Sequence, residues 1–174
     1  ILIQTSKMGF DDFIRTVTNP RVIASYKISF GCAFIAAGIN AVFGLIISWA
    51  LVRYDFRFKR FLDGCIDLPF ALPTAVAGIS LTTLYSKNGW IGSILDKFGI
   101  QGSFSTFGIT VALVFIGIPF VVRTVQPVLE DLDVSIEEAA SILGASRIQI
   151  FFKVIFPQLI APLLTGFSLA FARG

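Results

Sequence analysis

The chain has 174 residues, of which 55% are hydrophobic and 14% charged, and its mean hydropathy is +0.84. A soluble domain carries about 25% charged residues, so this composition excludes an ordinary soluble domain and indicates a membrane protein. The net charge of +3 comes from cations that flank apolar runs, which favours a role in orienting membrane spans over binding to nucleic acid.

Several classes of active site are excluded because their residue types are missing. The sequence has no histidine, and its two cysteines, Cys32 and Cys65, are isolated in apolar surroundings, so a zinc site, a histidine-based triad and a disulfide framework lack their parts. A G-x-x-x-x-G-K-[ST] phosphate loop is also absent, so the chain does not hydrolyse ATP by that route. We expect no metal, no cofactor and no enzymatic activity. Because the chain begins at Ile1 and stops at Gly174 in or just beyond an apolar run, we expect it to be a piece of a longer protein.

The first part of the chain contains a connector and one long span. Residues 1–27 mix charges with turn residues, and we expect them to form an external or interfacial connector. Residues 28–52 carry no charge and are long enough to cross a hydrocarbon core of roughly 30 Å. Four cations crowd into residues 53–60, as expected at a cytoplasmic end of a span. Small residues recur along the span at spacings near three and four, which predicts a face for close helix packing: Gly31, Ala33, Ala36, Ala37, Gly38, Ala41 and Gly44.

The second apolar stretch, residues 62–86, contains two prolines. Pro69 and Pro73 each leave a carbonyl without its usual donor, which predicts a kinked or broken helix. Broken backbone at membrane depth is tolerated only where protein or a water-filled path satisfies it. We therefore place a candidate translocation path here, although helix packing explains most of its residues equally well: Pro69, Pro73, Thr74, Gly78 and Ser80.

Asp67 stands at the start of this stretch. An ionisable residue in such a position suggests a proton relay, but an aspartate just before Leu-Pro is more ordinary as the N-cap of a restarting helix. Asp63 is expected to pair with Lys59 or Arg60.

Two further spans complete the predicted bundle. Residues 87–97 are rich in turn formers and predict an external loop with a small helix near residues 91–98. Residues 104–123 form the third predicted span, loosened by Gly117 and Pro119, and residues 158–173 form the fourth. The chain is therefore predicted to be an all-α polytopic transmembrane bundle with about four spans visible.

The segment between the third and fourth spans, residues 135–157, carries the signals of folded structure. Ser135 and Glu138 form an S-x-x-E capping box, which predicts a helix over residues 136–143. Gly144 can adopt the left-handed conformation that ends a helix, and a second box starting at Ser146 predicts an immediate restart. Pro157 marks where the second helix must end or kink. Two short helices joined by a glycine turn predict a compact elbow.

This segment resembles the EAA loop of ABC importer membrane subunits. The resemblance rests on Glu138-Ala139-Ala140, then Gly144, then Val154-Ile155-Phe156-Pro157, with Val154 and Phe156 standing where the family usually carries Ile and Leu. It implies a cytoplasmic loop that docks into a groove on a separate ATP-hydrolysing subunit, formed by Glu138, Ala139, Ala140, Gly144 and Pro157. The stretches DLPFALPTAVAG, residues 67–78, and PFVVRTVQPVLE, residues 119–130, are similar to sulfate and thiosulfate permeases within that family, more than to their molybdate relatives.

The resemblance implies a membrane-spanning subunit of an ATP-driven sulfate or thiosulfate importer. Its implied partners are an ATP-binding subunit, a second permease subunit that is a paralogue or a second copy, an extracytoplasmic sulfate-binding protein and the lipid membrane. Its implied location is the bacterial inner membrane or the plastid inner envelope, with the elbow in the cytoplasm or stroma. Sulfate, thiosulfate, molybdate and other oxyanions stay open as cargo.

Two other classes of function are weighed against this one. A membrane-anchored DNA-binding protein would use the elbow as a helix-turn-helix, but residues 130–157 hold five acidic and two basic residues, too few cations to grip a phosphate backbone. We therefore expect no nucleic-acid partner. A proton-coupled secondary transporter would use Asp67 as a proton site and would need no ATPase.

Overall fold

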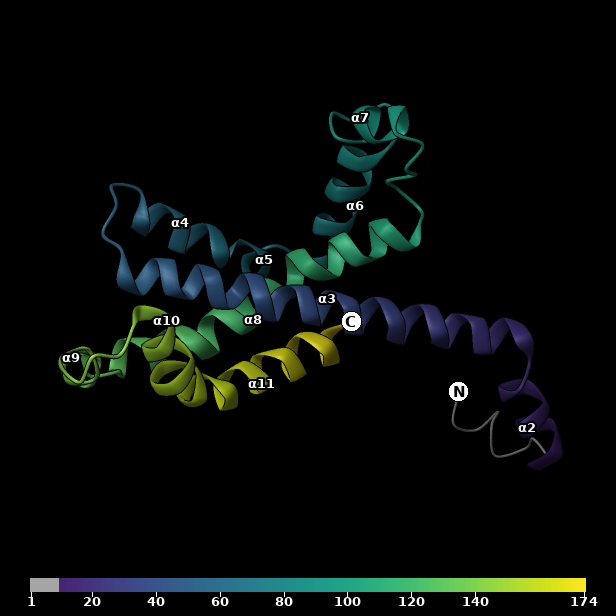
Figure 1. Cartoon of the computed structure of the whole chain (residues 1–174). Helices are drawn as coiled ribbons and strands as arrows, with labels where there is room; N and C mark the ends of the chain where they lie inside the picture. The colour runs from purple at the N-terminus through teal and green to yellow at the C-terminus, as the bar shows by residue number, and fades with distance from the viewer. Residues whose placement is uncertain (1–9) are drawn as a thin grey trace.

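The computed structural model describes residues 10–174, apart from the side chains of residues 10–13 and 74. Within that range the chain forms helices and no strand (Figure 1). The elements in order are α2 (Phe10–Val17), α3 (Pro20–Arg53), α4 (Lys59–Ile66), α5 (Leu68–Ala71), α6 (Thr74–Tyr85), α7 (Gly92–Lys97), α8 (Thr106–Asp131), α9 (Val134–Ile142), α10 (Arg147–Ile150), the π-helical segment η1 (Phe151–Ile155) and α11 (Phe156–Arg173).

Three helical stretches in the described part of the chain are long and apolar enough to cross a membrane. They are α3, α8 and the continuous stretch Arg147–Arg173, which joins α10, η1 and α11. The predicted all-α polytopic membrane bundle is confirmed by this arrangement. The third predicted span, residues 104–123, falls in α8, which continues to Asp131 through Pro119 and Pro127.

The N-terminal connector is more helical than expected. Asn19 caps α3 by accepting a hydrogen bond from the backbone N–H of Arg21 at 3.0 Å, and Pro20 occupies the first turn, where a missing N–H costs nothing. The helix therefore begins at Pro20 rather than at Ile28, and α2 precedes it. Within the predicted connector, residues 1–9 lie outside the described residues.

The second apolar stretch is divided into three helices, as the prolines predicted. Leu72 and Pro73 have extended backbone, with ψ angles of 132° and 133°, because the residue before a proline is pushed away from helical geometry. A second, tighter junction at Asp67 separates α4 from α5. In Figure 1, α6 and α7 rise away from α3, and α6 has only 12 residues. No continuous helix therefore covers residues 62–86.

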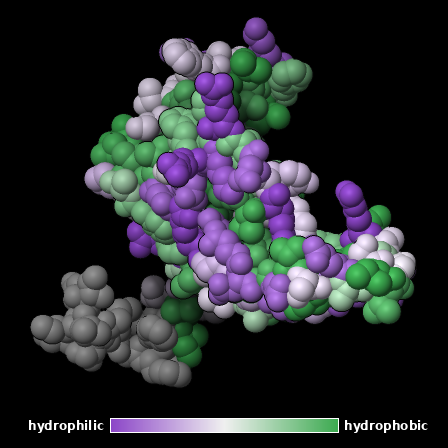
Figure 2. Space-filling model, turned by 90° about the vertical axis from the view of Figure 1, so that its left-hand side faces the viewer, coloured by the Kyte–Doolittle hydropathy of each residue, from purple (hydrophilic) through white to green (hydrophobic). Residues whose placement is uncertain are grey.

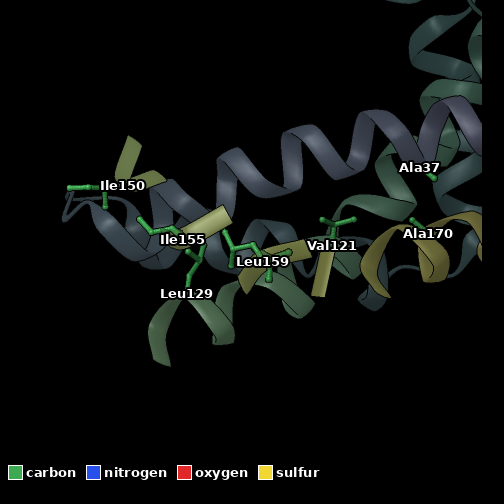
Figure 3. Packing of buried hydrophobic residues seen from close by; sticks show 8 residues of the cluster. Ala37, Val121, Leu129, Ile150, Ile155, Leu159 and Ala170 are labelled. Atoms are coloured by element: carbon green, nitrogen blue, oxygen red, sulfur yellow. The ribbon is translucent and has the colours of Figure 1, made fainter. Parts of the chain in front are cut away.

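The centre of the molecule is the packing of α3, α8 and α11 against one another. Its buried cluster comes mostly from α8 and α11 and their approach to α3, and seven of its residues are labelled in Figure 3: Ala37, Val121, Leu129, Ile150, Ile155, Leu159 and Ala170. Lipid tails are as apolar as these side chains, so close contact between small residues has to hold such helices together.

Glycines set the closest approaches in this core. A Cβ added at Gly44 of α3 would lie 2.6 Å from Cγ1 of Val121, and one at Gly166 of α11 would lie 2.7 Å from Cα of Val121. By contrast, a Cβ at Gly31 or Gly38 would meet nothing within 4 Å. The predicted small-residue face of α3 is thus used at Gly44, whereas Gly31 and Gly38 lie off the contact.

Two polar side chains of α3 are buried in this core. The hydroxyl of Ser48 donates to the carbonyl oxygen of Gly44 at 2.8 Å, so its polarity is satisfied within the helix. Asn40 donates from Nδ2 to the carbonyl oxygen of Leu113 at 3.5 Å, and its Oδ1 has no partner among the described residues. Asn40 also fills the space left open by Gly117, where a Cβ would lie 2.0 Å from Nδ2. Polar and small residues together therefore fix the register of α3 on α8.

Candidate functional site

The elbow consists of α9, the Gly144 turn, α10 and η1, and it lies at one end of the bundle between α8 and α11 (Figure 1). Its first cap differs from the prediction. Asp133, not Ser135, is the N-cap: its carboxylate accepts from the backbone N–H of Ser135 at 2.9 Å, and α9 begins at Val134. Asp133 is the better acceptor because it is charged and lies at the positive end of the helix dipole. The Ser135–Glu138 capping box is therefore absent, and Glu138 is free of any capping role.

The carboxylate of Asp133 is held in its ionised form by this cap. The pKa of Asp133 lies below its ordinary value because the backbone N–H of Ser135 donates to the carboxylate.

Gly144 ends α9 in a Schellman motif. Its φ is +85°, the backbone N–H of Ala145 donates to the carbonyl oxygen of Ala140 at 3.1 Å, and the N–H of Gly144 donates to that of Ser141 at 3.0 Å. A Cβ at Gly144 would meet nothing within 4 Å. The glycine is thus required by the left-handed backbone and not by crowding.

The second half of the elbow starts with the capping box that the sequence predicted. Ser146 Oγ accepts from the N–H of Gln149 at 3.4 Å, and Gln149 Oε1 accepts from the N–H of Ser146 at 2.9 Å. The backbone then widens into the π-helical segment η1 before α11, with Pro157 in the first turn of α11. A wider turn here accommodates a residue without an N–H and redirects the chain. Pro157 therefore marks a change of helix type at the start of α11.

Contacts with α3 hold the elbow to the bundle. Arg53, the last residue of α3, forms an ion pair with Glu137 of α9, and both side chains are largely buried. The guanidinium of Arg53 also lies 5.4 Å from the ring centroid of Trp49, whose ring meets that of Phe151 edge to face at 5.2 Å. On the inner side, Ile150 and Ile155 are buried in the core cluster. The orientation of the elbow is therefore set by α3 as well as by its own two neighbours in the chain.

The outer side of the elbow exposes large apolar side chains among polar ones. Ile142, Leu143 and Ile148 are 86%, 88% and 72% exposed. Glu138 and Ala139 are exposed as well, whereas Ala140 is partly buried against the core. Figure 2 views the molecule from this end and shows hydrophilic residues gathered across it, with hydrophobic patches among them. We call Ile142, Leu143 and Ile148 the apolar edge; apolar patches rimmed by polar residues mark sites of protein contact.

A second polar cluster joins the broken stretch to α8. Arg123 of α8 donates from Nε and Nη2 to the two carboxylate oxygens of Asp67, at 2.9 and 2.7 Å, and from Nη1 to Asp63 at 2.8 Å. Nη1 also donates to Gln126 Oε1 at 2.9 Å, and Nη2 to the carbonyl oxygen of Asp63 at 3.1 Å. We call these residues the Arg123 cluster.

Asp67 is the N-cap residue of α5, as predicted, but its side chain is engaged by Arg123, and the expected partner of Asp63 is wrong. Asp67 makes no side-chain capping hydrogen bond, and Asp63 pairs with Arg123 because it lies one helical turn before Asp67 on the same side of α4, while Lys59 pairs with Asp55 instead. With both carboxylate oxygens of Asp67 engaged by an arginine, which stays charged, the arrangement is unsuited to a proton relay.

The candidate path residues do not line one common hollow. Pro69 lies in an apolar groove of about 320 Å³ between α3, α4 and α8, Gly78 in a hollow between α6 and α8, and Ser80 in a third hollow beside the outer loop. Pro73 is exposed at the break, and the side chain of Thr74 lies outside the described residues. They share the broken stretch but converge on no site in this chain alone.

Sequence reasoning missed the long-range ion pairs. Arg123 stands at the end of an uncharged run and Arg53 within a group of four cations, and neither position indicates a distant partner. The spacing of Asp63 and Asp67, one helical turn apart, was the available signal that both could meet one guanidinium.

Similar proteins place these features in a family. The family model described as "binding-protein-dependent transport system inner membrane component" matches residues 40–174. The chain is 49% identical over 173 residues to the sulfate transport system permease protein CysT of Salmonella typhimurium, covering 99% of this chain and 62% of that protein. It is 47% identical over 173 residues to the probable sulfate transport system permease protein cysT of Zygnema circumcarinatum, covering 99% and 60%.

The match covers most of this chain but only part of its relatives. The chain spans about three-fifths of the length of the two relatives named above. The family match includes the second half of α3, the broken stretch, the Arg123 cluster and the whole elbow. The chain therefore belongs to the family of binding-protein-dependent transport system inner membrane components, which are membrane transport subunits and not enzymes.

Proposed function

We propose that this chain is part of the membrane-spanning subunit of an ATP-driven sulfate importer. The observation that carries the proposal is the elbow, a loop that the Arg53–Glu137 ion pair holds to α3 and that exposes the apolar edge at the end of the bundle. The similarity to proteins named as sulfate transport system permeases supports sulfate as the cargo. Thiosulfate, molybdate and other oxyanions are the alternatives that a competition assay separates.

The elbow couples this subunit to a separate ATP-binding subunit. The apolar edge would be covered in the complex, and Glu138 offers an exposed carboxylate to a basic residue of the partner. Ala139, beside it, allows a close approach of the two backbones. Because Glu137 forms an ion pair with Arg53, a displacement of α9 by the partner would also move the end of α3.

The broken stretch contributes to the path of the anion. Residues 28–52 and 68–86 contain no Lys or Arg that would hold a dianion tightly. A conduit must release its cargo, so weak binding suits it. Specificity would then come from an extracytoplasmic sulfate-binding protein, and the other half of the path from a second permease subunit, either a paralogue or a second copy. Pro69, Pro73, Thr74, Gly78 and Ser80 remain the candidate path residues of this half.

We place the elbow in the cytoplasm of a bacterium, with the chain in the inner membrane, or in the stroma of a plastid, with the chain in the inner envelope. Both locations are proposed because the similar proteins come from organisms as different as Salmonella typhimurium and Zygnema circumcarinatum.

The test compares elbow variants in the full-length protein purified with its ATPase partner. Glu138→Ala should weaken co-purification, because a charge presented to the partner is lost. Gly144→Val should reduce transport-coupled hydrolysis more strongly, because a β-branched residue resists a φ of +85° and would turn α10 away from α9.

The matched control for Gly144→Val is Gly144→Asn, because asparagine tolerates the left-handed conformation and the site has room for its side chain. Gly144→Asn should retain most of the coupling. Normal assembly and normal coupling in both Glu138→Ala and Gly144→Val would reduce the elbow to an ordinary loop and remove the basis of this proposal.

A further inference from the structure

The broken stretch has few buried contacts to hold it in place. No residue of α4 or α5 is buried, and the described contacts of α4, α5 and α6 with the rest of the bundle are chiefly with α8. Two contacts stand out between these pieces and α8: the Arg123 cluster, and the rings of Phe70 and Phe120, which meet edge to face at 5.0 Å. Phe70 lies about one turn after Asp67, and Phe120 about one turn before Arg123, so the ring contact and the ion pair lie on the same side of α8.

Every donor of Arg123 is used within its cluster. A guanidinium has five N–H donors, and the five hydrogen bonds of Arg123 go to Asp67, Asp63 and Gln126. Gln126 in turn donates to Glu130 at 3.0 Å, one turn further toward the elbow. An arginine with all its donors engaged, beside two carboxylates, has none left for an anionic cargo, so its role here is to position protein and not to bind sulfate.

The position of the cluster on α8 determines what it can transmit. α8 is one continuous helix from Thr106 to Asp131, and only Leu132 and Asp133 separate it from α9. The same helix therefore carries the elbow at its end and the Arg123 cluster two turns earlier. On the other side of the cluster, α5 leads directly into the break at Leu72 and Pro73.

We propose that Arg123 is a positioning residue that clamps the α4–α5 segment to α8, so that movement of the elbow is passed to the break at Pro73. The clamp does not include α6, which lies beyond the break and makes its own contacts with α8. The transport consequence rests on the proposed function, whereas the clamp itself concerns only contacts within this chain.

The first experiment measures the clamp without transport. The experiment uses a cysteine-free full-length protein in lipid nanodiscs, with Cys32→Ser and Cys65→Ser among its changes. In that background, Phe70→Cys with Phe120→Cys reports the approach of α5 to α8 by cross-linking with a short bis-maleimide. Arg123→Gln should lower the cross-linking rate by about fivefold or more. Arg123→Lys should lower the cross-linking rate by an intermediate amount, because lysine keeps the positive charge but cannot bind a carboxylate bidentately. Lys87→Gln, which removes an exposed ion pair with Asp96, is the control and should change nothing.

Rescue separates the clamp from a general loss of folding. Arg123→Asp combined with Asp67→Arg exchanges the two residues of the ion pair, so that an arginine and an aspartate still face each other. This double variant should restore at least about half of the cross-linking rate lost in Arg123→Asp alone. Cross-linking unaffected by Arg123→Gln, or an exchanged pair as poor as the single variant, would overturn the proposal.

The second experiment asks whether the clamp matters for coupling. In proteoliposomes containing the complete transporter, Arg123→Gln should lower sulfate transported per ATP by about fivefold while hydrolysis stays within about twofold, and the exchanged pair should recover it. Loss of sulfate binding with cross-linking intact would instead make Arg123 a cargo ligand and refute the clamp. If the wild-type complex imports no sulfate while cross-linking still depends on Arg123, the clamp stands and the proposed function fails.

Discussion

The three-helix core and the broken stretch are held by different physical means. In the core, α3, α8 and α11 approach so closely that Gly44, Gly117 and Gly166 leave no room for a Cβ. In the broken stretch, the helices α4 and α5 bury no residue and depend on the Arg123 cluster and one aromatic pair. Close backbone packing allows a single register, whereas ion pairs and ring contacts can separate and form again. The difference indicates a rigid frame carrying a segment that can be repositioned.

The largest expected effect comes from filling a close approach in the core. In Gly166→Ala, the new Cβ would lie 2.5 Å from Thr124 Oγ1 and 2.7 Å from the Cα of Val121, a backbone atom that cannot rotate away. We expect a loss of about 1–3 kcal/mol in stability, measured as a lower melting temperature in detergent. The matched control is Gly38→Ala, where a Cβ meets nothing within 4 Å, and it should be neutral or slightly stabilising. Equal effects of the two changes would mean that α11 is not packed on α8 as described.

The elbow should respond to loss of its ion pair by a smaller amount. Glu137→Gln leaves the largely buried guanidinium of Arg53, whose side chain is only 18% exposed, without its charged partner. We expect about 1–2 kcal/mol less protection of the α9 amides in hydrogen exchange, with the α3–α8 contact unchanged. Lys59→Gln, which removes an ion pair to the fully exposed Asp55, is the control and should leave exchange unaltered. Unchanged α9 protection in Glu137→Gln would show that α3 does not hold the elbow.

The smallest expected effect is a pH dependence confined to α9. Because the pKa of Asp133 is lowered in the folded chain, its capping contribution is complete above the ordinary pKa of about 3.9 and is lost as the pH falls through the lowered value. Acidification should therefore lower the protection factors of the amides at the start of α9, taken relative to the intrinsic exchange rate at each pH, before it affects α8. Asp133→Asn keeps a capping oxygen that does not titrate, so it should remove this pH dependence. The same dependence in Asp133→Asn would assign it to another group.

Local signals predicted the parts of the fold that depend on a few consecutive residues. The uncharged runs located α3, α8 and α11, the proline at 73 located the break, and Gly144 and Ser146 located the turn of the elbow. The Ser-x-x-Glu pattern predicts the first cap of the elbow two residues too late, because Asp133 accepts from the N–H of Ser135 and Ser135 is already inside the helix. The uncharged run predicts the start of α3 too late, because Asn19 and Pro20 begin the helix ahead of the charged residues that precede Ile28.

Contacts between distant residues could not be predicted in this way. Arg123 lies 56 residues from Asp67 and Arg53 lies 84 residues from Glu137, and no periodicity links such positions. Arg53 is one of four cations within residues 53–60, and Lys59 and Arg60 lie far closer to Asp63 in the sequence than Arg123 does. The pairing is decided by which helices lie side by side, and no pattern of consecutive residues encodes that arrangement.

The central claim, that this chain forms part of a path driven by ATP through the elbow, is tested most directly by sulfate uptake. The full-length protein, with its ATPase, second permease subunit and binding protein, is reconstituted in liposomes and supplied with labelled sulfate and ATP. We predict uptake that requires ATP, is competed by unlabelled sulfate, survives Gly144→Asn and is lost in Gly144→Val. Uptake that proceeds without ATP, or that is equal in the two Gly144 variants, would contradict the account.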